Sequence, residues 1–239
     1  MLVIAKDYPR IHMKKHLMRL SFILLFAVAS LTGFSQIFKG EAIVGMNVSQ
    51  VDGDETYGYH KAGFQGGVGV VAPIYKNWSL SLETLYSQKG SKLKPQFYDS
   101  LDGSYHLKLD YAVVPFMIQY TDKENVSAGV GVSWGRLVNV DEFKNGYRVD
   151  SVTLTSGVFD RDDWSAFGDV RVRVYKNLIL NMRYEHSIDK IATRTVIDSQ
   201  GGAPNERDFY NVLWSFRLIY MINEKRTDRS EPKRAPINE

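Results

Sequence analysis

Cysteine is absent from the 239 residues of this chain, which excludes disulfide frameworks, thiolate metal sites, a lipoprotein anchor and cysteine nucleophiles. The chain also lacks a long apolar run, because the longest one, at 20–31, has 12 residues. A bundle of transmembrane helices is therefore excluded, since each span needs about 20 apolar residues. Proline is scarce with 7 residues, whereas glycine with 19, tyrosine with 14 and phenylalanine with 12 are abundant. This composition favours strands and turns.

An export signal is indicated near the N-terminus. A basic stretch at 13–19 runs into the apolar run at 20–31, and the small residues Gly33 and Ser35 follow. This order of a basic region, a short apolar region and small residues near a cleavage site is typical of a secretory signal peptide. We therefore expect 1–35 to be an N-terminal extension plus a signal peptide that is removed on export. The alternative is a buried helix or a single membrane anchor.

Removal of that segment changes the charge of the chain. Residues 1–35 carry five Lys or Arg and one Asp, so the net charge of +3 on the whole chain falls to −1 without them. A nucleic-acid partner would require a basic cluster interleaved with stacking aromatic residues, and the sequence contains none. The sequence therefore gives no support for nucleic-acid binding.

Alternation of apolar and polar residues dominates from residue 40 onward. In 78–89, for example, Leu82 belongs to the apolar set and Glu83 to the polar set. A period of two predicts a strand with one apolar face. Seven segments show this pattern, and an eighth, at about 106–119, is apolar on both faces and contains Pro115, so its phase is ambiguous. The sequence therefore predicts eight strands.

The connections between these strands alternate in length. If every connection is a hairpin, all short connections lie at one end of the sheet and all long ones at the other. Outer-membrane barrels have this asymmetry, with short periplasmic turns and long outer loops. The short connections are expected at 73–77, 121–125 and 176–177, and the long ones at 50–60, 90–105, 138–163 and 190–208.

Two kinds of barrel fit this pattern. A soluble lipocalin-like barrel turns its apolar face inward, whereas a membrane barrel turns it toward lipid and fills its interior with the polar face. Here the apolar face is almost free of charge along the middle of each strand, and its aromatic residues gather near both strand ends, as the two interfaces of a bilayer select. These girdle residues are Tyr75, Trp78, Tyr120 and Tyr175 near the short connections, Tyr86, Trp134, Trp164, Tyr184 and Phe209 toward the long ones, and also Trp214 and Tyr220.

The polar face carries charges that only an interior network can satisfy. Buried Arg and Glu are very costly unless they are paired. An eight-stranded barrel has room inside for side chains only, which favours a structural network over a conducting pore. The predicted network comprises Glu83, Asp169, Arg171, Arg173, Arg183, Glu185 and Arg217.

Four segments of the strands resemble PorT-like outer-membrane β-barrel proteins: 45–49, 83–90, 109–116 and 129–133. Their order and spacing cover about 40–220. The resemblance implies an outer-membrane barrel of Bacteroidota-type Gram-negative bacteria, in a family whose members are mostly of unknown function. The namesake of the family is tied to type IX protein secretion, a role that these strand motifs do not carry over. The chain departs from the usual barrel pattern because it continues beyond the last strand.

We therefore predict an all-β, eight-stranded, antiparallel, up-and-down transmembrane β-barrel at 36–223, after the signal segment 1–35 and before an unstructured basic periplasmic tail at 224–239. The expected role is non-enzymatic, structural or interaction-based, in the outer membrane, with accessory work in secretion or envelope assembly as a candidate. Expected partners are outer-membrane lipid and other envelope or secretion proteins, and no cofactor or metal is expected.

Two alternatives stay open. One is a soluble periplasmic lipocalin-like barrel that binds a small apolar ligand, and the other is a lipid-modifying outer-membrane enzyme. The adjacent residues Glu185, His186 and Ser187 have the residue types of a catalytic triad. Neighbouring strand residues point to opposite faces of the sheet, so these three side chains cannot converge on one site.

Overall fold

The computed structural model describes residues 38–54, 56, 58–94, 103–123, 125–196 and 204–223. The chain separates into two compact units, 1–36 and 37–239, and all described residues belong to the second. The predicted signal segment and the predicted tail at 224–239 lie outside the described residues. Among the described residues, no helix is long and apolar enough to cross a membrane.

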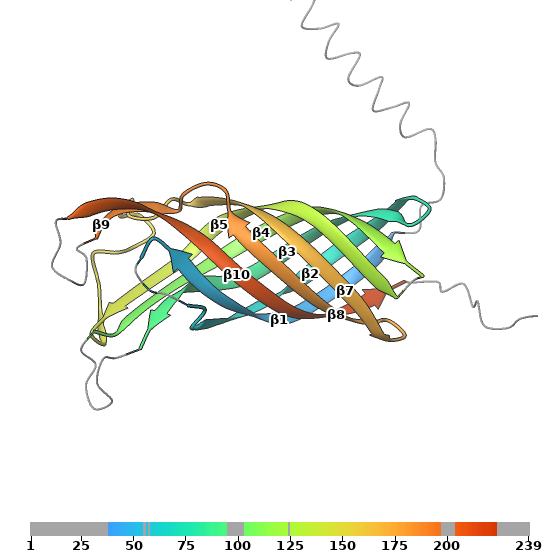
Figure 1. Cartoon of the computed structure of the whole chain (residues 1–239), viewed down its shortest axis with the longest axis horizontal. Coiled ribbons are helices and arrows are strands. Elements are labelled where there is room, and N and C mark those ends of the chain that lie inside the picture. Colours follow the sequence, from blue (N-terminus) through green and yellow to red (C-terminus); the bar gives the residue numbers. More distant parts are fainter. Residues whose placement is uncertain are drawn as a thin grey trace, which may run out of the picture. The chain divides into compact units, whose positions relative to one another are not determined.

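The described residues of the second unit form ten strands, and neighbouring strands are antiparallel throughout (Figure 1). Eight of them, β1, β2, β3, β4, β5, β7, β8 and β10, form a ring that closes through 13 residue pairs between β1 and β10. The strands are β1 (Lys39–Asp52), β2 (Lys61–Tyr75), β3 (Trp78–Leu93), β4 (Tyr105–Asp122), β5 (Val126–Lys144), β6 (Tyr147–Arg148), β7 (Asp162–Tyr175), β8 (Leu178–Ser187), β9 (Ala192–Val196) and β10 (Asn205–Ile222).

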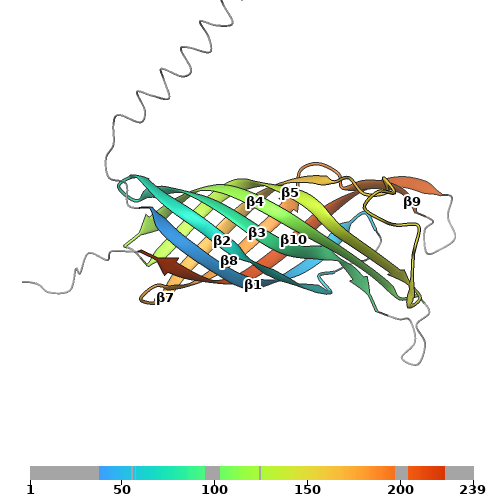
Figure 2. The ribbon, with the colours of Figure 1, turned by 180° about the vertical axis from the view of Figure 1, so that it is seen from behind.

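The prediction of an all-β, antiparallel, up-and-down arrangement is confirmed, but the prediction of eight strands in total is wrong by two. β6 folds back on the end of β5, and β9 pairs with the first part of β10. Both are short additions within long connections. The three short connections lie together at one end of the ring, and Figure 2 shows this end from behind. We call it the short-turn end and the opposite one the long-loop end.

Side chains alternate between the inside and the outside of the ring. Leu82 points outward and is 51% exposed, whereas its neighbours Ser81 and Glu83 are 1% exposed, and Val130 on β5 is likewise outward at 64%. The outward positions of the middle of the ring are apolar, and the inward ones are mostly polar. Period-two alternation in a two-faced strand produces this division directly.

A β-bulge explains why the fifth strand extends beyond its predicted end. β4 and β5 pair Asp110 with Asn139 and then Tyr111 with Leu137, which leaves Val138 without a partner in the register. The inward positions of β5 therefore change from odd to even numbers across Val138. The alternation breaks there, and the long connection predicted at 138–163 in fact begins after Lys144.

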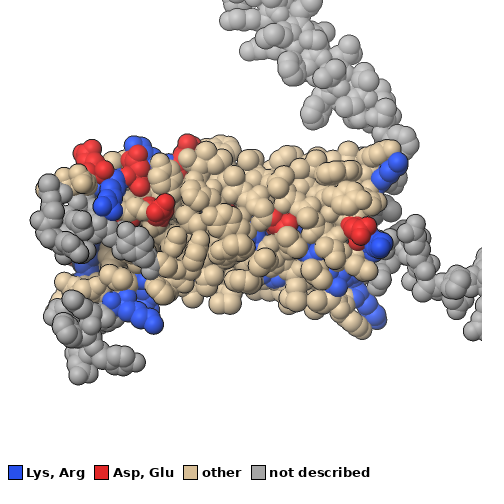
Figure 3. Space-filling view, viewed as in Figure 1, with Lys and Arg blue, Asp and Glu red and all other residues tan. Residues whose placement is uncertain are grey.

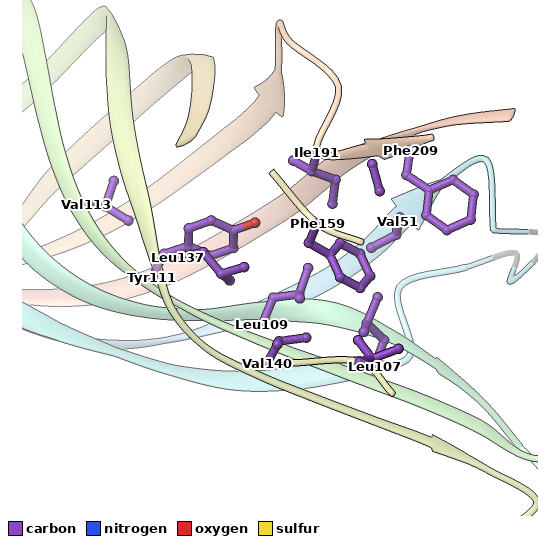
Figure 4. Packing of buried hydrophobic residues seen from close by; sticks show 12 residues of the cluster. Val51, Leu107, Leu109, Tyr111, Val113, Leu137, Val140, Phe159, Ile191 and Phe209 are labelled. Carbon is purple, nitrogen blue, oxygen red and sulfur yellow. The ribbon is translucent and has the colours of Figure 1, made fainter. Parts of the chain in front are cut away.

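Buried apolar side chains form two clusters inside the ring. The larger one lies toward the long-loop end and combines inward residues of β4 and β5 with residues of the connections (Figure 4). The smaller one comprises Ile43, Val71, Leu85, Ile179, Ile219 and Met221. Charged side chains occupy the interior around and between these clusters, and they form the main candidate site.

Candidate functional site: the interior and the two ends of the ring

Three guanidinium groups and three carboxylates meet in the interior of the ring. Glu83 on β3 accepts hydrogen bonds from Arg171 on β7, Arg183 on β8 and Arg217 on β10, at 2.7, 3.0 and 2.8 Å. Asp169 on β7 accepts from the same three side chains, at 2.8 to 2.9 Å. The side chains of all five residues are at most 3% exposed. We call this group, with Glu41, the central network.

The strand register brings these residues together. Asp169 lies opposite Arg183 in the pairing of β7 with β8, and Arg217 lies opposite Asn181 in the pairing of β8 with β10. Asn181 donates to Asp169 at 2.7 Å and accepts from Arg217 at 2.5 Å. Each arginine therefore reaches carboxylates on its own side and across the ring, and no strand supplies the network alone.

Two glycines provide the space that the long side chains need. A Cβ at Gly45 on β1 would lie 2.9 Å from Cα of Arg217, and a Cβ at Gly69 on β2 would lie 3.0 Å from Oε2 of Glu41. Both distances are too short for an ordinary side chain to fit without displacement of its neighbours. Glycine at these two positions of the polar face therefore leaves room for the arginine and glutamate side chains that extend into the interior.

Glu41 completes the charge balance of the central network. Its Oε1 accepts from Arg171 at 2.5 Å, so three carboxylates face three guanidinium groups. Paired, hydrogen-bonded charges avoid the large cost of isolated buried ions. The network holds β1, β3, β7, β8 and β10 together across the interior.

A second buried cluster lies next to the central network. The ammonium group of Lys89 on β3 contacts Asp163 at 3.0 Å and Glu185 at 2.6 Å. Asp163 also accepts from Ser187 at 2.6 Å and from Asn211 at 2.9 Å. We call these residues the lysine cluster, and its members come from β3, β7, β8 and β10.

The predicted network residues thus divide into three places. Glu83, Asp169, Arg171, Arg183 and Arg217 meet in the central network. Glu185 belongs to the lysine cluster instead. Arg173 lies near the short-turn end, where it donates to the carbonyl oxygen of Lys176 at 2.5 Å.

The predicted set omitted Glu41, Lys89 and Asp163, all of which are buried and paired. For Glu41 and Lys89 a signal was present, since both lie at inward positions of strands whose phase is clear. Asp163 lies in the long connection that the sequence predicts at 138–163, whereas β7 already begins at Asp162.

The triad-like residues of β8 point in opposite directions. Glu185 and Ser187 face the interior, where they bind Lys89 and Asp163. His186 is exposed, and its Nδ1 lies 2.7 Å from the carbonyl oxygen of Ser187. No acid–base–nucleophile contact joins these three described side chains.

An apolar cap fills the interior at the long-loop end. In Figure 4, Tyr111, Leu137 and Val140 from β4 and β5 approach Phe159 and Ile191 from the connections. The full cap comprises Val51, Leu107, Leu109, Tyr111, Val113, Leu137, Val140, Val152, Phe159, Ile191, Ala192 and Phe209, all at most 4% exposed. The placement of Phe209 in an aromatic girdle is therefore wrong, because its ring is buried in the cap.

Backbone hydrogen bonds tie the long connections over the cap. The amide of Leu137 donates to the carbonyl of Arg161 at 2.7 Å, and the amide of Asp160 donates to the carbonyl of Ile191 at 2.7 Å. Ile191 in turn donates to Phe209 of β10 at 2.8 Å. The described parts of these connections are thus fixed to the ends of the strands.

One carboxyl group of this end is unusually placed. Asp54, in the connection between β1 and β2, accepts hydrogen bonds from the hydroxyl of Ser91 and from the amide of Thr56. Burial removes this carboxyl from water and raises its pKa above the ordinary value of aspartate.

Outward aromatic rings lie at two levels of the ring. Along β3, Trp78 and Tyr86 are eight residues apart, which corresponds to about 26 Å of strand and about 20 Å of height at a tilt of about 40°. Along β7, Trp164 and Tyr175 are eleven residues apart, or about 28 Å of height by the same reasoning. These values bracket the apolar band of about 25 Å in outer-membrane barrels.

The other girdle residues are also placed outward. Tyr75, Tyr120, Tyr175 and Tyr220 are 42% to 64% exposed near the short-turn end, and Trp134 is 38% exposed at the other level. Tyr184 and Trp214 are half-buried because they pack on each other, with ring centroids 4.9 Å apart. In Figure 3 charged atoms gather mainly toward the two ends, and most of the surface between them is uncharged.

At the short-turn end the interior opens into a cavity of about 620 Å³. Glu41 and Arg171 of the central network line it, together with residues of the strand ends and turns such as Trp78 and Lys123. One oxygen of Glu41, Oε2, and the amide oxygen of Gln119 are buried at this cavity without a partner in the described residues.

A ring of antiparallel strands with apolar side chains outside and paired charges inside defines the class of an outer-membrane type barrel. The comparison with protein families agrees, since residues 34–193 match the family described as outer membrane protein beta-barrel domain. The chain belongs to this family.

Solved structures that resemble the chain are remote in sequence. The attachment invasion locus protein Ail of Yersinia pestis is 14% identical over 77% of this chain and 98% of its own, with a TM-score of 0.45. Neisserial surface protein A is 14% identical over 77% and 96%, with a TM-score of 0.43. OprG of Pseudomonas aeruginosa is 13% identical over 78% and 96%, with a TM-score of 0.42. No curated protein matches this chain.

Proposed function

We propose that this chain is an eight-stranded transmembrane β-barrel of the outer membrane that acts as a non-enzymatic structural or interaction protein after export and removal of 1–35. Family membership supports the outer membrane as its place. The apolar outward face supports contact with lipid. Side chains such as Val68 and Val130 are more than 60% exposed, and a continuous surface of such apolar side chains would be unfavourable in water.

The filled interior is the observation that carries the interaction role. The central network, the lysine cluster and the cap follow one another along the axis, and their side chains are almost completely buried. Beyond the cavity at the short-turn end, these buried side chains leave no continuous lumen for a permeating solute. The ordered surface of the long-loop end is therefore the part of the molecule that is available for contacts with other envelope components.

The resemblance of four strand segments to PorT-like proteins supports one kind of partner. We propose an accessory role in secretion or envelope assembly, in a Bacteroidota-type outer membrane. Tyr147 is suited to test this role, since it is 81% exposed at the tip beyond β5. A photo-crosslinking residue there should capture an envelope protein, whereas the same residue at the lipid-facing Val130 should not.

The two alternatives make different predictions. A soluble lipocalin-like barrel would need its apolar face inside, and a lipid-modifying enzyme would need convergent groups such as those that Glu185, His186 and Ser187 fail to form. Membrane fractionation with heat-modifiable gel migration tests the first, because a soluble barrel appears in the periplasmic extract. Mass spectrometry of lipid A from a deletion strain tests the second.

Conductance separates the interaction role from a pore. Purified protein in a planar bilayer is expected to give no steady single-channel current. A stable current that the Glu83→Gln change alters would contradict the proposal, because it would mean that ions pass the central network.

A further inference from the structure

The three short turns share a residue that their backbone does not favour. Lys76, Lys123 and Lys176 have φ values of +48°, +46° and +29°. In this left-handed region the Cβ of an ordinary residue crowds the following carbonyl oxygen, so glycine and asparagine are the usual choices. Two of the turns even repeat the same three residues, Tyr-Lys-Asn, at 75–77 and 175–177. Turn geometry alone does not explain lysine at all three positions.

Two of these lysines, Lys76 and Lys176, contact outward tyrosine rings, and Lys123 lines the cavity at the same end. The ammonium group of Lys76 is 5.0 Å from the ring centroid of Tyr75, and that of Lys176 is 5.4 Å from the ring centroid of Tyr175. Both tyrosines point outward and are more than 60% exposed. Contact with the ring face holds each positive charge at the level of the short-turn girdle.

Positive charge dominates this end of the molecule. The described residues of the turns and adjoining strand ends include Lys39, Lys76, Lys123, Arg173 and Lys176 but only the carboxylate of Asp122. When Glu124 from the same stretch of sequence is counted as well, five positive charges stand against two negative ones, an excess of three. Figure 3 accordingly shows mostly blue atoms here, whereas both colours occur at the long-loop end.

The cations of the two ends also differ in their partners. At the long-loop end Arg136, Arg148 and Lys190 form ion pairs of 2.8 to 3.1 Å. Within the described part of the chain, Lys76, Lys123 and Lys176 form no ion pair with a carboxylate. Their charges are thus available to an anion from outside the chain.

We propose that Lys76, Lys123 and Lys176 bind the phosphate groups of anionic phospholipids in the leaflet that the short turns face. The inference rests on the proposed membrane barrel, since only a bilayer places headgroups at the girdle. Lysine binds phosphate as a point charge on a flexible stem, and Tyr75 and Tyr175 would hold the stems of Lys76 and Lys176 at headgroup depth. Attraction of this kind is screened by salt.

The test removes the charges without harm to the turns. Asparagine suits a positive φ, so the variant K76N/K123N/K176N should fold at least as well as the natural chain in neutral vesicles. The matched control, K94Q/K144Q/K190Q, removes three exposed lysines from the long-loop end. The full chain without 1–35 is inserted into phosphatidylcholine vesicles with or without phosphatidylglycerol, and retained phosphatidylglycerol is counted by native mass spectrometry after detergent extraction.

We expect the natural chain and the control to retain severalfold more phosphatidylglycerol than the asparagine variant, with a difference that shrinks as salt rises. Equal retention by all three proteins would overturn the inference. Thermal protection of the natural chain by inorganic phosphate in neutral vesicles, lost in the variant, would also overturn it, because the anion would then be a soluble one. Heat-modifiable migration of the same samples reports insertion, and failure to insert in any vesicle would count against the membrane barrel itself.

Discussion

The two halves of the interior bury their side chains in opposite ways. The half toward the short turns holds the central network and the smaller apolar cluster behind a wall whose outer surface is apolar. The half toward the long loops holds the larger apolar cap, with the lysine cluster next to Tyr111. β4 contains both arrangements, with Phe116 and Ile118 pointing outward in one half and Leu107 and Leu109 pointing inward in the other. The two halves of β4 thus differ in their outward side chains, which are polar at His106 and Lys108 and apolar at Phe116 and Ile118.

The surroundings of each half account for this inversion. Where hydrocarbon covers the wall, apolar side chains are cheapest outside and the interior takes the polar ones. Where water covers the wall, the ordinary hydrophobic effect drives apolar side chains inward. In 106–119 the inward side chains are apolar from Leu107 to Met117, whereas only the part after Tyr111 is also apolar outward. This is why the phase of that segment is ambiguous in the sequence.

The largest effect should come from the central network. Glu83→Gln removes the carboxylate charge that three arginines share and should lower the free energy of unfolding by about 3–5 kcal/mol, as expected when one partner of a buried ion pair is lost. Urea titration of the inserted protein measures this. Ser81→Ala on the same strand is the control, and a similar midpoint for both variants would mean that the network does not stabilise the ring.

A change in the cap should act on the other half. Leu109→Ala deletes a side chain with 0% exposure and should cost about 2–5 kcal/mol, the range for buried leucine. Because the cap fixes the long connections, limited proteolysis should cut 149–161 faster, while heat-modifiable migration stays normal. Loss of insertion in this variant would show that the two halves do not fold as separable parts.

The lipid-facing wall gives the next effect. Leu82→Arg places a charge between the two aromatic levels of β3 and should cost about 2–4 kcal/mol on the lipid face. Membrane assembly should fail, as judged by fractionation, whereas Leu82→Met should assemble normally. Normal assembly of the arginine variant would indicate that the outer surface at Leu82 faces water and not lipid, and the two halves would then not differ in their surroundings.

The smallest effect concerns pH at the long-loop end. Burial raises the pKa of Asp54, so the folded state favours the protonated form, and its stability should increase as pH falls through that pKa. Hydrogen exchange at the amide of Thr56, which donates to Asp54 at 2.8 Å, is the local readout. Asp54→Asn should remove this pH response, and persistence of the response would assign it to another group.

The inward and outward faces of a strand could be predicted from the sequence wherever one face is apolar and the other polar. β3 shows this, because Leu82 and Glu83 differ in polarity and no irregularity interrupts the alternation. The prediction fails beyond Val138, since a single unpaired residue reverses the phase. Local alternation carries no signal for such a shift.

Spatial grouping of the site could be predicted only in part. Inward direction follows from alternation, but the separation of Glu185 from the central network depends on the register between strands, which hydrophobic periodicity does not specify. The cap cannot be predicted from the sequence, because Phe159 and Ile191 lie in connections that have no hydrophobic periodicity. Their burial follows from the packing of loops against strand ends, which is a long-range property.

The pairing of β1 with β10 joins residues as distant as Val44 and Leu218. A seam between the first and last strands of the ring can form only after the last strand has been synthesised, and until then both strands present unpaired backbone groups. Closure of the ring is therefore a late event in the biogenesis of this chain. Until β1 and β10 pair, the open intermediate must be kept from pairing with other copies of the chain.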